Sequence, residues 1–196
     1  IETGEAGPMT PVGINLPNDQ KVREEYGSKS VSLSNVSEAY EKSKVPEFRR
    51  EFAWAPEEVA RADKWGALAD ELSTNMHEVI GHASGQVSDA VGGNPATILK
   101  EQYSALEEGR ADLVALYFIA DPKLAELGLI KAADQAELVQ AEYEGYTRGA
   151  LVQLRHLRQG SQIAEDHMRN HQMIVHWLIA STKAIEVRQR EGKTYY

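Results

Sequence analysis

Apolar residues recur at intervals of three and four positions through most of the chain after residue 55, and this spacing predicts helices. The first helix is predicted to begin at Pro56, because a proline and the acids Glu57 and Glu58 suit a helix N-terminus. Its apolar positions continue to Ile80. The segment HEVIGH (77–82) is therefore expected near the C-terminal end of this helix.

Further helices are predicted downstream. One runs over about 98–120, and a short one follows at 122–127. Two long amphipathic helices are expected at roughly 132–158 and 161–190, separated by Gly160.

The first 55 residues lack a helical period, because prolines and glycines interrupt them. The segments VGINLP (12–17) and SVSLSNV (30–36) alternate apolar and polar residues and predict two short strands. The expected fold class is mainly α, with a short irregular and β segment at the N-terminus. We expect one domain over 1–196, divided into a strand-and-loop part (1–55) and a helical part (56–196).

Composition narrows the function. A net charge of −9 without clustered Lys and Arg argues against nucleic-acid binding. No apolar run is long enough to span a membrane, and the first residues lack a signal-peptide pattern. We therefore expect a soluble protein, in the cytoplasm in preference to the periplasm, with the compartment left open. The absence of Cys leaves His, Asp and Glu as ligands for any metal.

HEVIGH contains the residue types of a zinc peptidase site. His77 and His82 can bind the metal, and Glu78 between them can take a proton from water. Positions five apart on a regular α-helix lie roughly 140° from alignment, however. Gly81 allows the backbone to relax into a π-bulge or a frayed turn that brings His82 toward His77.

A pair of neutral histidines leaves zinc in need of an anionic ligand, and the segment EEGRAD (107–112) on the next predicted helix offers several. Glu108 and Asp112 share a helix face, so one acid can ligate while Asp112 orients a histidine. Arg110 is placed to pair with Glu107 three residues before it. A solvated charged face is the alternative, but apolar neighbours favour a partly buried cluster that needs a cation. Spacing alone does not rank Glu107 against Glu108.

Together HEVIGH and EEGRAD resemble the paired HExxGH and EExRAD motifs of the dipeptidyl peptidase III family of zinc peptidases. The resemblance extends to GINLPND (13–19), GSKSVSLSNV (27–36) and AEDHMRNHQMI (164–174), and so covers most of the chain.

The resemblance implies that His77, His82 and Glu108 bind one zinc ion and that Glu78 is the general base. It implies that Glu107 and Asp112 support these ligands through hydrogen bonds.

For the substrate, the resemblance implies that Asn15 and Asn18 contact the peptide backbone, with the strand through Gly13 pairing to the extended peptide. His167 matches a histidine that stabilises the tetrahedral intermediate. His171 stands where the resemblance implies an Arg, a departure that bears on substrate preference.

The remaining histidines and aromatic residues have no support from these motifs. We assign no role to His156 and His176, and we interpret Tyr143, Tyr146 and Trp177 as core residues.

The expected activity is zinc-dependent hydrolysis of peptide bonds, with release of N-terminal dipeptides implied by the resemblance. The alternative is a zinc-stabilised peptide-binding module, or an inactive part of such a peptidase. Family members have two lobes and are several times longer, so we expect this chain to be part of a larger protein whose second lobe completes the cleft.

Overall fold

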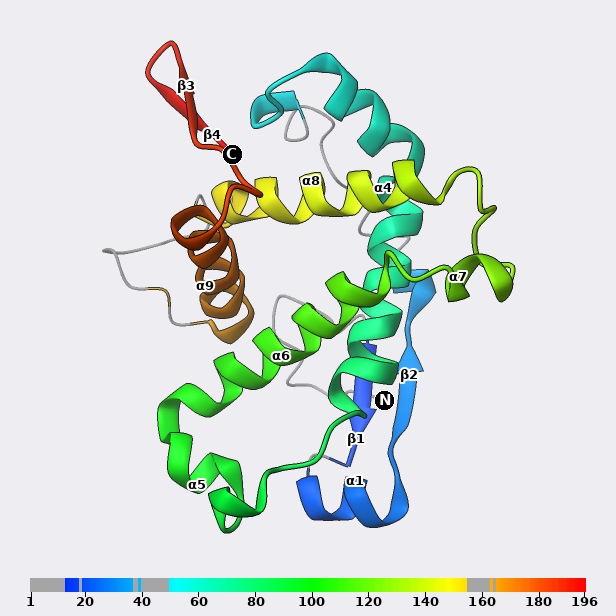
Figure 1. The fold of residues 1–196 in the computed structure, drawn as a ribbon, viewed down its shortest axis with the longest axis vertical. Coiled ribbons are helices and arrows are strands. Elements are labelled where there is room, and N and C mark those ends of the chain that lie inside the picture. Colours follow the sequence, from blue (N-terminus) through cyan, green and yellow to red (C-terminus); the bar gives the residue numbers. More distant parts are fainter. Residues whose placement is uncertain (1–12, 18, 37–38, 40–49, 155–162, 164) are drawn as a thin grey trace.

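The computed structural model describes residues 13–17, 19–36, 39, 50–154, 163 and 165–196, and it is mainly helical (Figure 1). Two small antiparallel sheets of two strands each accompany the helices. The expected mainly α fold class is confirmed. Within these residues, no helix is long and apolar enough to cross a membrane.

Helix α4 (Pro56–Met76) begins at the predicted residue, with Glu57 and Glu58 in its first turn. It continues directly into the π-helix η1 (His77–His82), which is the HEVIGH segment. The prediction of a long helix that carries HEVIGH at its C-terminal end is therefore confirmed. The wider turn of a π-helix is also the local change that a five-residue histidine spacing requires.

The segment predicted as one helix over 98–120 is instead divided. It consists of α5 (Pro95–Leu99), the 3-10 turn η3 (Lys100–Gln102) and α6 (Tyr103–Phe118). The cause is Lys100, whose φ of 50° lies outside the helical region and interrupts the hydrogen-bond ladder. Another 3-10 turn, η2 (Asp89–Val91), lies in the preceding loop.

The C-terminal third contains α7 (Lys123–Glu126), α8 (Gln135–Gln153) and α9 (Asp166–Ser181). Helix α8 is shorter than the predicted 132–158, whose last residues lie outside the described part of the chain.

The prediction of a helix over 161–190 is wrong at its end. Beyond Ser181 the chain forms a hairpin of β3 (Arg188–Arg190) and β4 (Lys193–Tyr195). The two turn residues, Glu191 and Gly192, both have positive φ, which matches the right-handed twist of a tight hairpin.

Near the N-terminus, β1 (Gly13–Leu16) pairs with β2 (Lys29–Ser32), so both predicted strands exist, although the second ends earlier than expected. Between them lies α1 (Gln20–Tyr26), which the strand-and-loop interpretation missed. The Asp19 side chain caps this helix by accepting a hydrogen bond from the Val22 N–H at 3.0 Å. A capping acid followed by helix-forming residues was the available signal.

The hydrophobic core lies where α4 meets α6, α7 and α8. Helix α6 also packs against η1 on one side and against α9 on the other (Figure 1). The buried core residues are Ala69, Leu72, Met76, Ala115, Ile119, Leu124, Ile130 and Leu138. Helix α6 therefore connects the core to the HEVIGH segment.

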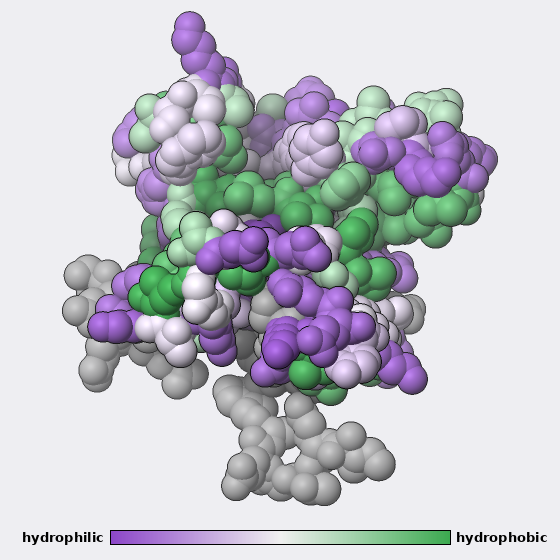
Figure 2. All heavy atoms as spheres, turned by 60° about the horizontal axis from the view of Figure 1, so that its bottom comes forward, coloured by the Kyte–Doolittle hydropathy of each residue, from purple (hydrophilic) through white to green (hydrophobic). Residues whose placement is uncertain are grey.

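None of the three aromatic residues interpreted as core belongs to it, since Tyr146 is half-buried and contacts Asp112. Tyr143 is 42% exposed and Trp177 is 61% exposed, so those assignments are wrong. Periodicity marks one face of each helix, but it does not show which faces the described chain covers. Figure 2 shows hydrophobic and hydrophilic residues side by side on the surface, and Leu113 and Tyr117 of α6 are among the exposed apolar residues.

We predict that Gly81→Ala destabilises the protein by about 1–3 kcal/mol, because a Cβ at this position would lie 2.9 Å from the Ala111 Cα and Cβ atoms. Gly66→Ala in α4 is the matched control, since its Cβ would meet nothing closer than 4.0 Å and would stabilise the helix by about 0.5–1 kcal/mol. Urea unfolding of both variants measures the difference. Equal stability of the two variants would contradict the close packing of η1 on α6.

Candidate metal centre

The π-helix turns two imidazoles toward a single carboxylate. The Nε2 atom of His77 lies 3.1 Å from Glu108 Oε2, and the Nε2 atom of His82 lies 3.5 Å from the same oxygen. Each of the three residues offers a ligand atom within 4.8 Å of the others. Two nitrogens and one anionic oxygen in this arrangement form a donor set that suits a divalent metal ion such as zinc.

The opposite nitrogen of each imidazole contacts a further carboxylate. His77 Nδ1 lies 2.7 Å from Asp112 Oδ1, and His82 Nδ1 lies 3.0 Å from Glu107 Oε1. An ionised carboxylate only accepts hydrogen bonds, so both Nδ1 atoms carry the proton in these contacts. In a neutral ring this leaves the lone pair on Nε2, the atom directed at Glu108, as metal binding requires.

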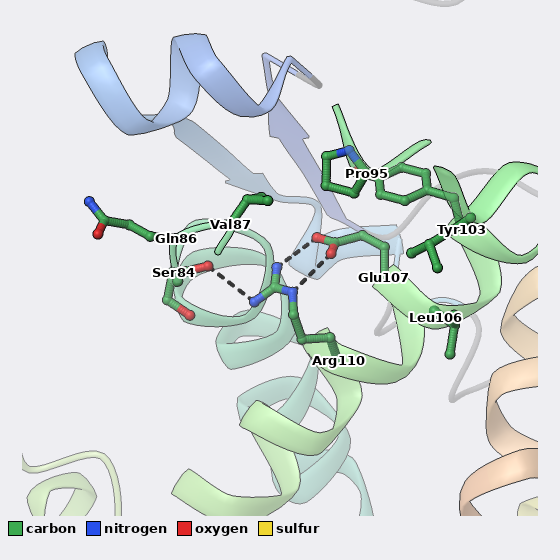
Figure 3. Close-up of a pocket in the computed structure, with 10 residues that line it drawn as sticks. Ser84, Gln86, Val87, Pro95, Tyr103, Leu106, Glu107 and Arg110 are labelled. Atoms are coloured by element: carbon green, nitrogen blue, oxygen red, sulfur yellow. Dashed lines mark hydrogen bonds and ion pairs between the residues drawn. The ribbon is translucent and has the colours of Figure 1, made fainter. Parts of the chain in front are cut away.

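An arginine fixes the position of Glu107 (Figure 3). Arg110 donates from Nε to Glu107 Oε2 at 2.8 Å and from Nη2 to Oε1 at 2.6 Å. A third bond from Arg110 Nη1 reaches the Ser84 carbonyl at 3.1 Å, so the loop after η1 is tied to α6. The predicted pairing of Arg110 with Glu107 is confirmed, and this carboxylate is oriented before any ligand arrives.

Protons occupy the metal-free cluster at neutral pH. Burial disfavours charge on His77, but hydrogen bonds to Asp112 and Glu108 outweigh this and raise its pKa to about 10. For His82, burial is outweighed by hydrogen bonds to Glu107 and Glu108, and its pKa is raised to about 9. Burial likewise opposes ionisation of Glu107, yet Arg110 and His82 lower its pKa to about 2. The histidines and carboxylates thus form a charged cluster in which a metal cation can replace the protons on the imidazoles.

The cluster opens onto a cavity of about 370 Å³. Residues from β1, α1, η1, α6 and α9 line it, including Gly13, Asn15, Glu78, His82, Glu108 and His167. Glu107 borders both this cavity and the adjoining pocket drawn in Figure 3. The cavity therefore places Glu78 and His167 beside the candidate metal ligands.

Glu78 and strand β1 lie in direct contact. A Cβ at position 13 would come within 2.8 Å of Glu78 Oε1, so only a glycine leaves the carboxyl group where it is. The Glu78 backbone carbonyl accepts hydrogen bonds from Asn15 Nδ2 at 2.9 Å and from Ser30 Oγ at 3.2 Å. Strands β1 and β2 thus position both the side chain and the backbone of Glu78.

Asn15 is 8% exposed, and the nitrogen and oxygen of its side-chain amide differ in their hydrogen bonds. Its Nδ2 group donates to the Ser30 hydroxyl at 2.7 Å as well as to Glu78, which fixes which way round the amide lies. Its Oδ1 atom has no hydrogen-bond partner among the described residues. A buried acceptor without a partner is costly, and Asn15 lines the cavity beside Glu78.

His167 and His171 of α9 differ in their surroundings. His167 lies in the first turn of the helix, and its Nδ1 atom is 3.4 Å from Glu108 Oε2. Glu165 positions this turn by accepting hydrogen bonds from the His167 and Met168 N–H groups. His171 instead packs away from the centre against Tyr146. Asn18 and His156 lie outside the described residues.

Arg23 is a contributor that sequence reasoning missed. Its Nη1 atom donates to the His82 carbonyl at 3.0 Å and lies 3.8 Å from Glu107 Oε1. Helix α1 therefore contacts the C-terminal end of η1, as strands β1 and β2 contact Glu78. A single Arg in an unrecognised helix, far from HEVIGH in the sequence, gives no local signal of this contact.

The fold and the site together define a helical protein with a candidate metal site, in which two histidines of a π-helix meet a glutamate of α6. The family model for peptidase family M49 matches residues 5–96 and 88–195, which is nearly the whole sequence. The chain therefore belongs to peptidase family M49.

The chain is also similar to several known proteins. The chain is 28% identical over 181 residues to dipeptidyl peptidase 3 of Mus musculus, covering 76% of this chain and 23% of that protein. It is 30% identical over 156 residues to Nudix hydrolase 3 of Arabidopsis thaliana, covering 76% and 18% of the two proteins. A solved structure of DPP III from Caldithrix abyssi has a TM-score of 0.59 and 26% identity, covering 86% of this chain and 30% of that one. The chain thus spans between 18% and 30% of the length of these relatives.

We predict that zinc binding releases about two protons per ion at pH 7, because His77 and His82 must lose the protons that their raised pKa values retain. The apparent zinc affinity should therefore increase with pH until the pH approaches 9 to 10, and decrease on acidification. Calorimetry in two buffers of different ionisation enthalpy measures the protons released. Binding with no proton release would contradict this assignment of the ligands.

Proposed function

We propose that the chain forms the zinc-binding and catalytic part of a metallopeptidase that releases N-terminal dipeptides from oligopeptides. The observation that carries the proposal is the convergence of His77, His82 and Glu108, with both imidazole Nδ1 atoms already bonded to carboxylates. Membership of peptidase family M49, a metallopeptidase family, supports it.

In this proposal His77, His82 and Glu108 hold the zinc ion. Asp112 and Glu107 keep the two imidazoles in the tautomer and orientation that ligation needs. When bound, zinc supplies Lewis acidity that polarises a scissile carbonyl and lowers the pKa of water.

Glu78 is the proposed general base. Glu78 lines the same cavity as the ligands His82 and Glu108, and Gly13 leaves its carboxyl group room there. It takes a proton from the attacking water and passes it to the departing amine. The hydrogen bonds of Asn15 and Ser30 to its backbone carbonyl limit movement of the residue during this transfer.

His167 is proposed to stabilise the developing oxyanion. Its ring lies on the cavity wall next to Glu108, and its side chain is 63% exposed, so a bound peptide can reach it. An imidazole N–H directed at the scissile carbonyl oxygen strengthens its hydrogen bond as negative charge develops there.

Strand β1 is the proposed docking site for the peptide backbone. It pairs with β2 on one edge, and no other described strand pairs with it. An extended peptide can add to such an edge through main-chain hydrogen bonds. Gly13 and Asn15 face the cavity, and the unused Asn15 Oδ1 atom offers an acceptor to the N-terminal part of the substrate. Asn18 is proposed as a further backbone contact, on the family resemblance alone.

The remainder of the cleft is proposed to come from a second lobe. The chain covers about a quarter of dipeptidyl peptidase 3 of Mus musculus, and members of the family that it resembles have two lobes. We therefore place catalysis in the longer protein, with the substrate held between this chain and that lobe.

We predict that Glu78→Gln lowers kcat for a dipeptidyl arylamide by at least about 100-fold in the intact protein, because the amide does not accept the proton from water. Zinc content, measured by elemental analysis, should stay the same since Glu78 is not a ligand. Glu71→Gln is the control, as Glu71 is an exposed acid on α4.

Unchanged turnover in Glu78→Gln would contradict the proposed role of Glu78 as the general base. Zinc binding by the parent protein without turnover of any peptide would instead favour the alternative of a peptide-binding module. Release of products longer than two residues would retain the peptidase and contradict dipeptide specificity.

We also predict that Asn15→Ala raises KM about tenfold with a smaller effect on kcat, because the substrate loses the acceptor at Oδ1. Ser30→Ala separates this role from support of Glu78, because Ser30 shares the contact with the Glu78 carbonyl but does not line the cavity. Steady-state kinetics of both variants test this. Equal KM values for the two would show that Asn15 acts only as support.

A further inference from the structure

Asp112 is held from two sides. Its Oδ1 atom accepts a hydrogen bond from His77 Nδ1 at 2.7 Å, and its Oδ2 atom accepts one from the Tyr146 hydroxyl at 2.9 Å. Tyr146 belongs to α8, so the carboxylate on α6 is bridged between η1 and a third helix. With both oxygens engaged, rotation of the Asp112 side chain breaks one bond or the other.

Tyr146 is itself fixed by His171 of α9. The two rings stack with centroids 3.9 Å apart and an interplanar angle of 26°. The imidazole Nε2 atom donates to the Tyr146 carbonyl at 2.6 Å, and Nδ1 accepts from Gln153 Nε2 at 2.8 Å. A Cβ at Gly149 would lie 2.8 Å from His171 Cε1, so α8 carries a glycine where the imidazole packs.

We propose that Tyr146 is a positioning residue of the metal centre, which keeps Asp112 aimed at His77 and is itself held in place by His171. This inference rests on the proposed binding of zinc by His77, His82 and Glu108. It assigns to Tyr146 and His171 a function that acts through Asp112, with no contact to the metal.

The protonation state of Tyr146 suits this role. Burial raises the pKa of its hydroxyl, and the charge of Asp112 raises it further, so the group stays protonated and remains a donor. A hydrogen bond from a neutral donor to an ionised carboxylate is among the stronger kinds in proteins. Tyr146 therefore restrains Asp112 without removing its negative charge.

Tyr143 provides a comparison on the same helix. Its hydroxyl also donates to α6, at 2.9 Å, but to the backbone carbonyl of Leu116 and not to Asp112. Loss of either hydroxyl removes one bond between α8 and α6. A purely structural role predicts similar effects for both tyrosines, whereas a positioning role predicts an effect on the metal for Tyr146 alone.

The test compares Tyr146→Phe with Tyr143→Phe in the intact protein. Zinc affinity is measured by competition with a chromophoric chelator, and thermal unfolding is followed with and without zinc. We expect Tyr146→Phe to weaken zinc binding by about tenfold, the lower end for loss of a group that orients a ligand. Tyr143→Phe should bind zinc as the parent does. The metal-free unfolding temperatures of the two variants should be similar.

A double-mutant cycle then shows whether Tyr146 acts through Asp112. In an Asp112→Ala background, Tyr146→Phe should cause no further loss of zinc affinity. Wild-type affinity in Tyr146→Phe, an equal loss in Tyr143→Phe, or an undiminished effect in the Asp112→Ala background would each overturn the inference. Failure of the parent protein to bind zinc would overturn the proposed function as well, so the two failures are distinct.

Discussion

The structure depends on a geometric constraint: two histidines five residues apart must present their Nε2 atoms to one point. A regular α-helix turns them away from each other, and the π-helix over His77–His82 brings them back. This turn is tolerated because Gly81 lets α6 approach until the backbone of Ala111 fills the space that a side chain would take. The close approach places Glu107, Glu108 and Asp112 beneath the imidazoles.

The charges of the site also prepare it for a cation. Three carboxylates and two imidazoles lie close together with little exposure, and Arg110 and Arg23 both lie beside Glu107. The carboxylates raise the pKa of each histidine, so the imidazoles hold protons when no metal is bound. The same carboxylates that raise these pKa values orient the imidazoles, so proton retention and readiness for a cation have one physical origin.

Local chemistry in the sequence predicted the part of the site that lies within two neighbouring segments. HEVIGH with its extra residue indicated a widened turn at Gly81, and the spacing within EEGRAD indicated that Arg110 pairs with Glu107 and that Asp112 shares a face with Glu108. Both N-terminal strands and the long helices from α4 onward were also predictable, but α1 and the break at Lys100 were not. Contacts made across the fold were not, because nothing near Arg23 or Tyr146 in the sequence marks their partners on η1 and α6. The C-terminal hairpin was missed for a different reason, since its Glu191-Gly192 turn is a weaker signal than Asn-Gly.

The contact between Gly81 and Ala111 has a consequence for inheritance and for engineering. HEVIGH supplies one side of this van der Waals contact and EEGRAD supplies the other, so neither segment packs correctly without its partner. A chimaera that imports HEVIGH from one protein and the EEGRAD helix from another must match them at these two positions before any ligand is considered. The unit that can be moved between proteins is the pair of crossing helices with the loop that joins them.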